Sequence, residues 1–505
     1  MANRMVSKRR TFGRSSWLHA CNRAGALLAL CLCMGMESGA WATNAAPDPL
    51  EGKWWGTTGT DRERVEVGFE FIRDAEGKLR MRFTQPITNV FDYADSSEIV
   101  REGDRVSIES FALALTLKGD TLTGTYPGPR SKALLRRVDA IPTEAPIPDV
   151  PTGPGPLWQT RLGGQVFATP AIFEGVAYIG GTGGVLNAVD LAKGEVKWTF
   201  PSGGPIFGGV AVAGDAVFFA CDNGFLYKLD RATGKQVWRY DLGDADVPRV
   251  LPHPSVFDWD WQGATPAIAD GTVYVGSGEG SLHAVDAGSG ERRWRFATNG
   301  KIRNAAAVDG ERVVFGSADH FVYALDRKTG AERWRHDTRA DVNATPLIDG
   351  GRIYIGNRGA GLYALDAASG TEIWRLYFWG SWVESTPVIA EGVLYIGSSD
   401  LRRVSAIDPA DGHVRWRSDV RGWSWGTPLV VGDRIYAAAA GGTPYFVRHL
   451  ASLSTLDRKT GRLLTRWPFP DTGGHQWGIA GSPVRDGDRV IVATIEGSLY
   501  AFPVQ

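Results

Sequence analysis

Six copies of one nine-residue unit, Asp-x-x-x-Gly-x-x-x-Trp, constrain the fold of this chain more than any other feature. The copies begin at Asp190, Asp230, Asp286, Asp326, Asp366 and Asp408, and three of the steps between them are 40 residues long. A seventh copy begins at Asp457 and keeps its glycine, but its tryptophan, Trp467, comes two residues late. Self-similarity at such a period is typical of propellers and solenoids, in which each repeat buries its apolar surface against its neighbours.

Each repeat predicts four short antiparallel strands. In the third repeat the segments PAIA, TVYVG, SLHAVD and RRWRF follow one another, with glycine-bearing turns between them. Alternating apolar residues and such turns are hairpin signals. A tryptophan on the outermost strand covers it with a large apolar surface, and its N–H group needs a partner. We expect seven tryptophans to dock in this way: Trp158, Trp198, Trp238, Trp294, Trp334, Trp374 and Trp416.

The number of blades follows from the inner strands. They begin near Thr169, Gly209, Thr265, Ala305, Thr345, Thr386, Thr427 and Ser482. The last repeat lacks an outer strand of its own, and the segment LWQTRL (157–162) can supply it. The sequence therefore predicts an all-β protein in which residues 157–505 form an eight-bladed β-propeller with four-stranded blades, closed by a strand from the start of the unit.

These repeats resemble those of the pyrroloquinoline-quinone (PQQ) repeat propellers. The segments ALDRKTGAERW (324–334) and AVDAGSGERRW (284–294) match the tryptophan-docking pattern of that family, and the resemblance covers roughly residues 155–505. The family includes quinoprotein dehydrogenases, which bind PQQ and calcium, and the BamB-type scaffold of outer-membrane protein assembly, which binds neither. Because both kinds share one fold, the resemblance implies the architecture and leaves the function open.

Residues 1–42 have the composition of an export signal. Basic residues precede the apolar run AGALLALCLCMGM (24–36), and Ala40 and Ala42 offer a small-x-small cleavage site. The pair Arg9-Arg10 resembles a twin-arginine signal, with an ordinary basic segment as the alternative. No later stretch approaches the length of a membrane span. We therefore expect a periplasmic or secreted protein.

Export changes the cysteine count and the net charge. Cys221 is the one cysteine outside residues 1–42, so we expect no internal disulfide. Without those 42 residues the chain keeps 49 of its 55 basic and 55 of its 56 acidic residues, a net charge of −6. This charge argues against nucleic acid as a partner. We expect a monomer.

A small β-domain is predicted at residues 43–140. Segments at 65–71, 78–83, 111–117 and 121–126 alternate with period two, which predicts a lipocalin-like barrel or a β-sandwich. Residues 141–156 contain six prolines and are predicted to be a semi-extended linker.

Two long insertions fall on the same predicted face of the propeller. One is the connection after Trp238, with HPSVFDWDWQ (253–262), and the other is the loop with TPYFVRHL (443–450). Binding residues concentrate in loops on a rigid scaffold; drift in loop length is the alternative. The aromatic residues there could stack on a planar cofactor, a sugar or a partner's side chain, or could pack blades together. The candidates are Trp259, Trp261, Trp382, Trp423, Trp425, Tyr445, His449 and His475.

The position just before each inner strand should face the central channel. Blades four to six place Arg303, Asn343 and Glu384 there as neighbours. This set could hold an acidic ligand or a calcium ion with water, or could be a salt-bridge cluster that satisfies itself.

No catalytic or metal-binding motif is predicted, and the sequence favours a protein that is not an enzyme. The hypothesis is an envelope binding or scaffold protein similar to BamB, with a protein partner or ligand on its loop face and no cofactor. One alternative is a quinoprotein dehydrogenase with PQQ and calcium, although such dehydrogenases commonly place PQQ against a disulfide that a single cysteine, Cys221, cannot form. The other is a receptor for a sugar or small molecule that uses Trp382 and Trp425.

Overall fold

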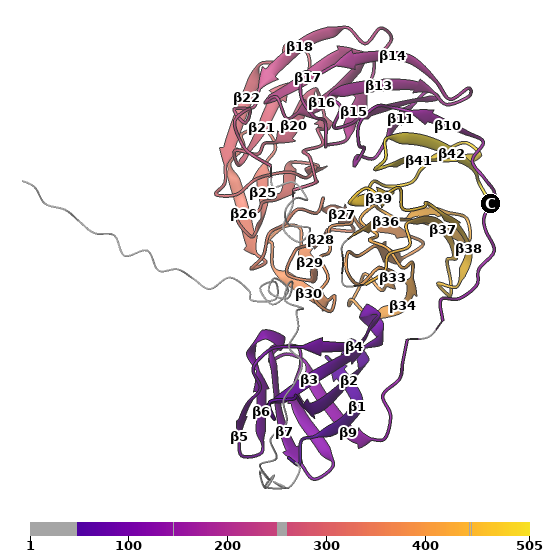
Figure 1. The fold of residues 1–505 in the computed structure, drawn as a ribbon. Helices are drawn as coiled ribbons and strands as arrows, with labels where there is room; N and C mark the ends of the chain where they lie inside the picture. The colour runs from indigo at the N-terminus through magenta and orange to yellow at the C-terminus, as the bar shows by residue number, and fades with distance from the viewer. Residues whose placement is uncertain (1–47, 145, 250–259, 444, 446) are drawn as a thin grey trace, which may run out of the picture. The chain divides into compact units, whose positions relative to one another are not determined.

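The computed structural model describes residues 48–144, 146–249, 260–443, 445 and 447–505. It contains two compact units, one ending at Pro146 and one spanning Ile147–Gln505, and Figure 1 draws both. Among the described residues the helical elements are two 3-10 turns, η2 (Pro86–Thr88) and η3 (Glu109–Phe111). None of the described helices is both long and apolar enough to cross a bilayer. The predicted export signal lies outside the described residues.

The first unit is one curled antiparallel sheet of nine strands that resembles a half-barrel. Its strand order is β4-β3-β2-β1-β9-β8-β7-β6-β5. The strands are β1 (Gly52–Gly59), β2 (Arg64–Arg73), β3 (Leu79–Gln85), β4 (Val90–Asp95), β5 (Val100–Glu102), β6 (Arg105–Ile108), β7 (Leu113–Lys118), β8 (Thr121–Thr125) and β9 (Lys132–Val138). Alternate residues point into one core, where Phe69 stacks on Phe83 at 5.8 Å and Trp54 donates to the carbonyl of Leu50 at 2.8 Å.

The second unit is the predicted propeller, with its blades numbered in chain order (Figure 1). Blades 1 and 2 comprise β11 (Ala171–Phe173), β12 (Val176–Gly180), β13 (Val185–Asp190) and β14 (Glu195–Pro201), then β15 (Val210–Ala213), β16 (Ala216–Cys221), β17 (Phe225–Asp230) and β18 (Gln236–Asp241). Blades 3 and 4 comprise β19 (Ala267–Ala269), β20 (Thr272–Gly276), β21 (Ser281–Asp286) and β22 (Arg292–Ala297), then β23 (Ala307–Asp309), β24 (Arg312–Gly316), β25 (Phe321–Asp326) and β26 (Glu332–Asp337).

Blades 5 to 7 continue the same order from the inner to the outer strand. Blades 5 and 6 comprise β27 (Leu347–Asp349), β28 (Arg352–Gly356), β29 (Gly361–Asp366) and β30 (Glu372–Tyr377), then β31 (Val388–Ala390), β32 (Val393–Ile396), β33 (Arg403–Ile407) and β34 (Val414–Asp419). Blade 7 comprises β35 (Leu429–Val431), β36 (Arg434–Gly442), β37 (Ser452–Asp457) and β38 (Leu463–Pro468), and β39 (Gln476–Gly478) pairs with the end of β36.

Blade 8 joins the two ends of the propeller unit. It contains β40 (Val484–Asp486), β41 (Arg489–Thr494) and β42 (Ser498–Pro503), and β10 (Trp158–Arg161) is its outer strand. Trp158 lies opposite Ala501 in this antiparallel pair. The predicted eight-bladed fold, including the donated outer strand, is confirmed.

An outer ring of tryptophans links neighbouring blades. The Nε1 of Trp374 donates to the carbonyl of Pro409 in the next blade's turn at 3.0 Å, and Asp408 caps that turn by accepting from the N–H of Ala410 at 2.9 Å. Gly412 closes the turn with a φ of +79°, and a Cβ there would lie 2.8 Å from the Trp374 ring. The same donation to a carbonyl of the next turn recurs at Trp158, Trp198, Trp238, Trp294, Trp334 and Trp416.

Blade 7 departs from this pattern, and its register explains the late tryptophan. Thr465 occupies the docking register opposite Thr455, and the two hydroxyl oxygens lie 2.6 Å apart. Trp467 instead packs against Phe502 of blade 8 with ring centroids 5.8 Å apart. The segment before β10 lies against the outer strand of blade 7. The N–H of Arg466 in that strand donates to the carbonyl of Pro151 in the segment at 3.0 Å.

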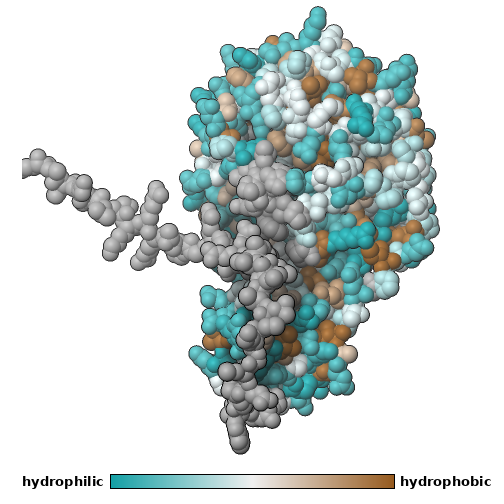
Figure 2. Space-filling view, viewed as in Figure 1, coloured by the Kyte–Doolittle hydropathy of each residue, from teal (hydrophilic) through white to brown (hydrophobic). Residues whose placement is uncertain are grey.

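Exposed apolar side chains are scattered over the described surface. The face drawn in Figure 2 is mostly hydrophilic, with hydrophobic residues interspersed. The most exposed examples on outer strands of the propeller are Val196, Val237 and Ile373. Single exposed apolar residues of this kind are normal on soluble folds and indicate no particular site.

Candidate functional site

The eight positions predicted to face the channel line one central cavity of about 270 Å³. They are Phe167, Phe207, Gly263, Arg303, Asn343, Glu384, Trp425 and Ala480. The structure therefore brings the predicted Arg303, Asn343 and Glu384 to the same cavity, together with Trp261 and Trp425.

The inner strands approach one another closely around this cavity. A Cβ on Gly208 would lie 2.2 Å from the carbonyl oxygen of Ala264 in the next blade, so only a very small residue fits there. Hydroxyl groups at the start of the inner strands join the blades, because the N–H of Gly209 donates to Thr265 at 2.7 Å and that of Ser482 to Thr169 at 2.9 Å. These contacts hold the lining of the cavity in place.

An aromatic stack crosses one end of the channel. Trp425 lies between Trp261, with ring centroids 4.6 Å apart, and Trp423, at 4.8 Å. Trp423 also contacts two residues of the blade 7 insertion, Tyr445 at 5.1 Å and His449 at 4.3 Å. The two insertions predicted to share a face therefore meet through this stack, and five of the predicted aromatic residues pack on one another.

The carboxylate of Asp400, in the turn between β32 and β33, supports the stack. Asp400 accepts hydrogen bonds from the Nε1 of Trp423 at 3.1 Å and from the hydroxyl of Tyr445. Burial raises the pKa of Asp400, and burial together with this carboxylate raises the pKa of Tyr445 well above its ordinary value. His449 is buried, and burial lowers its pKa to about 3. At neutral pH this imidazole is uncharged and acts as an aromatic packing group.

The predicted charged residues form ion pairs with residues other than each other. The Nε of Arg303 lies 3.3 Å from Asp260, and Lys301 binds the same carboxylate at 3.1 Å. Glu384 accepts from the Nε of Arg358 at 2.7 Å. The predicted cluster is therefore divided into two ionic groups, one in which Arg303 and Lys301 share the Asp260 carboxylate and one in which Glu384 binds Arg358. Asn343 lines the same cavity.

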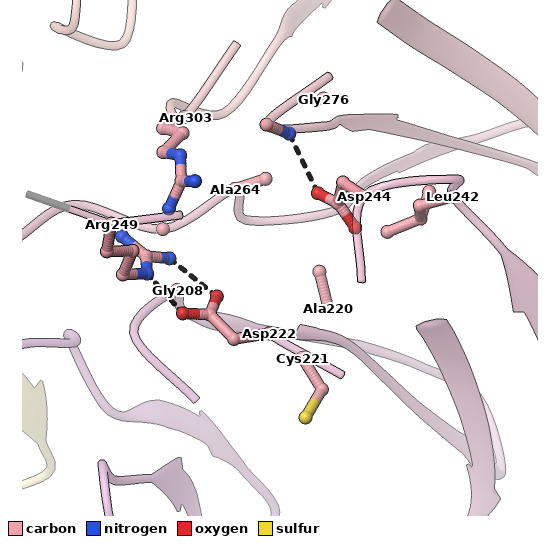
Figure 3. Close-up of a pocket in the computed structure, with 12 residues that line it drawn as sticks. Gly208, Ala220, Cys221, Asp222, Leu242, Asp244, Arg249, Ala264, Gly276 and Arg303 are labelled. Atoms are coloured by element: carbon pink, nitrogen blue, oxygen red, sulfur yellow. Dashed lines mark hydrogen bonds and ion pairs between the residues drawn. The ribbon is translucent and has the colours of Figure 1, made fainter. Parts of the chain in front are cut away.

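A second, water-sized cavity of about 20 Å³ adjoins Arg303. Figure 3 shows Arg249 bound through two nitrogens to Asp222, with Asp244 and Cys221 on the other side of the cavity. Arg249 also donates to the carbonyl of Gln262 at 2.6 Å, and its guanidinium lies over the Phe207 ring at 4.0 Å. Arg249 thus fastens the blade 2–3 insertion to the channel wall.

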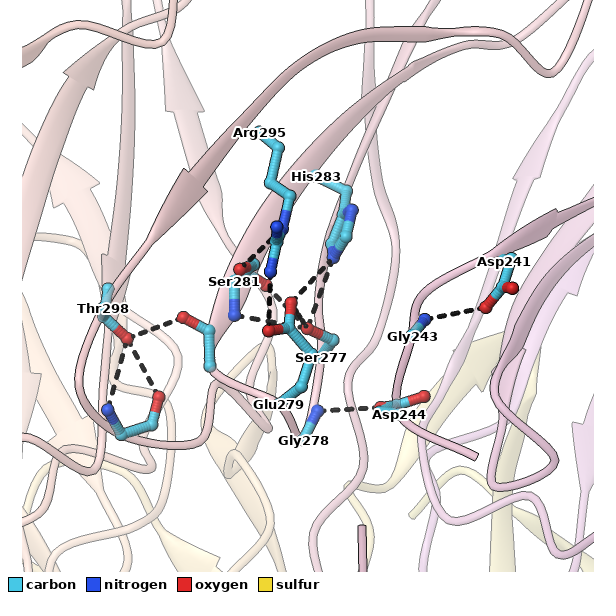
Figure 4. A network of polar contacts seen from close by, with 12 residues as sticks. Asp241, Gly243, Asp244, Ser277, Gly278, Glu279, Ser281, His283, Arg295 and Thr298 are labelled. Carbon is cyan, nitrogen blue, oxygen red and sulfur yellow. Dashed lines mark hydrogen bonds and ion pairs between the residues drawn. The ribbon is translucent and has the colours of Figure 1, made fainter. Parts of the chain in front are cut away.

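His283 belongs to a structural network in blade 3. Its Nε2 lies 3.3 Å from the Ser277 hydroxyl oxygen (Figure 4). The Glu279 carboxylate accepts a hydrogen bond from the Arg295 guanidinium at 2.7 Å. Burial lowers the pKa of His283 to about 4. Blades 4 and 5 place Tyr323 and Tyr363 at the same register, so His283 replaces a buried packing residue.

The remaining predicted site residues lie apart from the stack. Trp382 is half-buried beneath the guanidinium of Arg358 at 4.2 Å, and His475 is exposed next to the Thr443 carbonyl at 3.4 Å. Trp259 lies outside the described residues. Sequence reasoning missed Asp260, which lies in an insertion without a repeat equivalent. It also missed Asp400, although Glu279 and Asp319 are acidic at the same position of blades 3 and 4.

A family model described as outer membrane protein assembly factor BamB matches residues 151–246, 222–375 and 358–505. The chain belongs to this family. No curated protein matches the chain by sequence.

Solved structures show the same fold as this BamB-family chain at low sequence identity. BamB from Moraxella catarrhalis is 20% identical, with 69% of this chain and 96% of that chain covered and a TM-score of 0.52. Quinohemoprotein alcohol dehydrogenase from Comamonas testosteroni is 17% identical over 69% and 76%, with a TM-score of 0.53. A europium-containing methanol dehydrogenase is 14% identical over 67% and 84%, with a TM-score of 0.55.

The residues of this BamB-family channel do not fit PQQ. PQQ is a planar quinone with three carboxylates, so a site for it needs available cations and an open aromatic face. Here Arg358 is bound by Glu384, Arg303 shares the Asp260 carboxylate with Lys301, and Trp261 and Trp423 both stack on Trp425. Among the described residues no group of three or more His, Cys, Asp or Glu side chains is arranged to hold a metal ion.

Proposed function

We propose that this protein is an exported binding scaffold of the bacterial envelope, which contacts a protein partner through its loop face. The loop face is the end of the propeller that carries Trp261, Trp382, Trp425, Tyr445 and His475. Membership in the BamB family supports this function. Export would use residues 1–42, leaving the small β-domain at 43–140 and the linker at 141–156 in front of the propeller at 157–505.

The observation that carries this proposal is that both long insertions are anchored to each other. Trp423 and Trp425 connect Trp261 of one insertion to Tyr445 of the other. A loop surface fixed in this way loses little conformational entropy when a partner binds, which favours affinity. Arg448 and His475 are exposed on the loop face.

Crosslinking in the native cell tests which face binds a partner. A photoreactive amino acid is placed at Arg448 or His475 on the loop face and, as matched controls, at the exposed Glu391 or Asp433 in turns at the opposite end of the blades. We expect one adduct of defined mass, with an envelope protein, from the loop-face positions alone. Equal adducts from both faces, or none from either, would contradict the proposal.

A second experiment separates this function from a quinoprotein dehydrogenase. Purified protein is titrated with PQQ, with and without calcium, while tryptophan fluorescence and dye-linked oxidation of alcohols and sugars are followed. We expect neither saturable quenching nor turnover, because the cations of the channel are already paired. Calcium-dependent quenching with turnover would replace the scaffold function with an enzymatic one.

A further inference from the structure

Asn299 is an exposed asparagine followed by a glycine, in the connection between β22 and β23 on the loop face. Its side chain makes no hydrogen bond to the residues that the structure describes, although its backbone N–H donates to Oδ2 of Asp319 at 3.0 Å. Asparagine is a chemically labile residue. A glycine after it leaves the next backbone nitrogen open to the side-chain amide, because glycine has no Cβ. Asn299 therefore combines a free amide with an unshielded neighbour.

Packing between two blades requires the glycine at position 300. A Cβ on Gly300 would lie 2.2 Å from the backbone nitrogen of Asp319 in blade 4, so no larger residue fits there. The backbone N–H of Gly300 is only weakly bonded, because the nearest acceptor, the hydroxyl oxygen of Thr298, lies 3.5 Å away. The close approach of blades 3 and 4 thus places a glycine with an available nitrogen directly after the free amide.

The chain contains a second asparagine–glycine pair, and the structure protects it. The Nδ2 of Asn223 donates to the carbonyl of Ser202 at 2.6 Å and to the hydroxyl of Tyr227 at 2.7 Å. The N–H of Gly224 donates to the carbonyl of Cys221 at 3.0 Å, and Gly224 is buried. Both reacting groups of this pair are held by hydrogen bonds, whereas in the first pair the amide is free and the glycine nitrogen is weakly bonded.

We propose that Asn299 is a site of spontaneous deamidation, which converts it to aspartate and isoaspartate in the folded protein. The backbone nitrogen of Gly300 loses its proton and bonds to Cγ of Asn299. The Cγ–Nδ2 bond breaks, and the amide nitrogen leaves as ammonia with that proton. Water then opens the cyclic succinimide, at Cγ to give aspartate or at the backbone carbonyl carbon to give isoaspartate. Water is the co-reactant, and the reaction involves no oxidant or reductant.

The products change the charge and the backbone of the loop face. A carboxylate at position 299 replaces a neutral amide next to Asp319, which already accepts the Tyr323 hydroxyl at 2.8 Å, so two like charges come near each other. Isoaspartate also lengthens the main chain shortly before Lys301, which binds Asp260 at 3.1 Å. The modification goes beyond the scaffold function and does not depend on it.

Peptide mass spectrometry of the purified protein, incubated at pH 8 in heavy-oxygen water and digested in ordinary water, tests the site. Heavy oxygen in the product separates conversion in the folded protein from conversion during digestion. We expect Asn299 to convert roughly tenfold or more faster than Asn223, because the hydrogen bonds at Asn223 must break before it reacts. Methylation of the converted peptide by an isoaspartyl methyltransferase identifies isoaspartate. Asn299→Gln, whose longer side chain cannot close the same ring, should show no conversion at this position.

The synthetic peptide FATNGKI (296–302) is the unfolded reference. Thermal unfolding of the incubated protein establishes that it stays folded. The proposal is overturned if Asn299 stays unconverted in the folded protein while the peptide converts, because the fold would then protect it. It is also overturned if Asn223 converts as fast as Asn299, because the contacts that distinguish the two pairs would then have no effect.

Discussion

The propeller has two rings of equivalent positions, and they differ in how much they repeat. At the outer ring seven tryptophans make one contact, a donated hydrogen bond to the turn of the next blade. At the inner ring the eight positions carry seven residue types, from glycine to tryptophan and from arginine to glutamate. A contact that every blade needs is repeated, whereas a surface that serves one ligand or partner has no reason to repeat. The outer ring therefore encodes the fold, and the positions that do not repeat, in the inner ring and on the loop face, are where function is to be sought.

The largest effect expected at the outer ring is from Trp374→Ala. Trp374 is 2% exposed and fills the space beside Gly412, so its loss should lower the free energy of unfolding by about 3–5 kcal/mol. Urea unfolding of the two proteins measures this. The neighbouring Ile373→Ala, at a residue 41% exposed, should change stability by no more than about 0.5 kcal/mol. Similar losses for both variants would show that docking is not what stabilises the ring.

Gly412→Ala tests the other half of the same contact. Both Gly412 and Gly432 have positive φ, but a Cβ on Gly412 meets the Trp374 ring at 2.8 Å and one on Gly432 meets nothing within 4 Å. We expect a loss of about 2–4 kcal/mol for Gly412→Ala and about 1 kcal/mol for Gly432→Ala. If both variants lost the same free energy of unfolding in urea, the cost would come from the positive φ alone and not from the contact with the Trp374 ring.

His283→Tyr tests a position where one blade departs from its neighbours. Because burial lowers the pKa of His283 from 6.5 to about 4, the unfolded chain takes up a proton before the folded chain does. Stability should fall as the pH drops from 6.5 to about 4, by about 1.4 kcal/mol per pH unit for this group. His283→Tyr introduces the residue found in blades 4 and 5, which does not titrate in this range. Its free energy of unfolding should therefore fall less steeply as the pH is lowered. An unchanged slope in unfolding at pH 7, 6 and 5 would contradict the assignment.

The smallest effect is expected at the hydroxyl contacts of the inner ring. Thr265→Val leaves the N–H of Gly209 without the acceptor that lies 2.7 Å away, which should cost about 1 kcal/mol. Thr386 lines the same cavity, and its hydroxyl makes no hydrogen bond to the residues the structure describes. Thr386→Val should therefore be nearly neutral. If Thr386→Val lost more stability than Thr265→Val in thermal unfolding, the hydroxyl contacts would not be what joins the blades.

The repeats made the propeller predictable and the channel partly so. The Asp-Gly-Trp unit predicted the four-stranded repeat and its turns, and the recurring inner strands predicted the number of blades. The closing strand was predicted because the last repeat lacks an outer strand of its own. Aligning the blades also gave the eight channel positions.

The contacts that join the insertions were not predictable in the same way. Trp261 stacks on Trp425, and Tyr445 donates a hydrogen bond to Asp400. In each contact one partner, Trp261 or Tyr445, lies in an insertion that has no repeat equivalent. In the first unit, five of the nine strands were missed, and of these β5 and β6 are too brief to establish a period.

The pairing of β10 with β42 has a consequence for how the protein is made. Gln159 and Ser498, which are bonded across that pair, are 339 residues apart. The first strand of the ring emerges from the ribosome early and waits for a partner that is synthesised nearly last. A chain released before Ser498 therefore keeps an exposed strand edge that proteases and chaperones can recognise, so an unfinished product is distinguishable from a finished one at the moment of release.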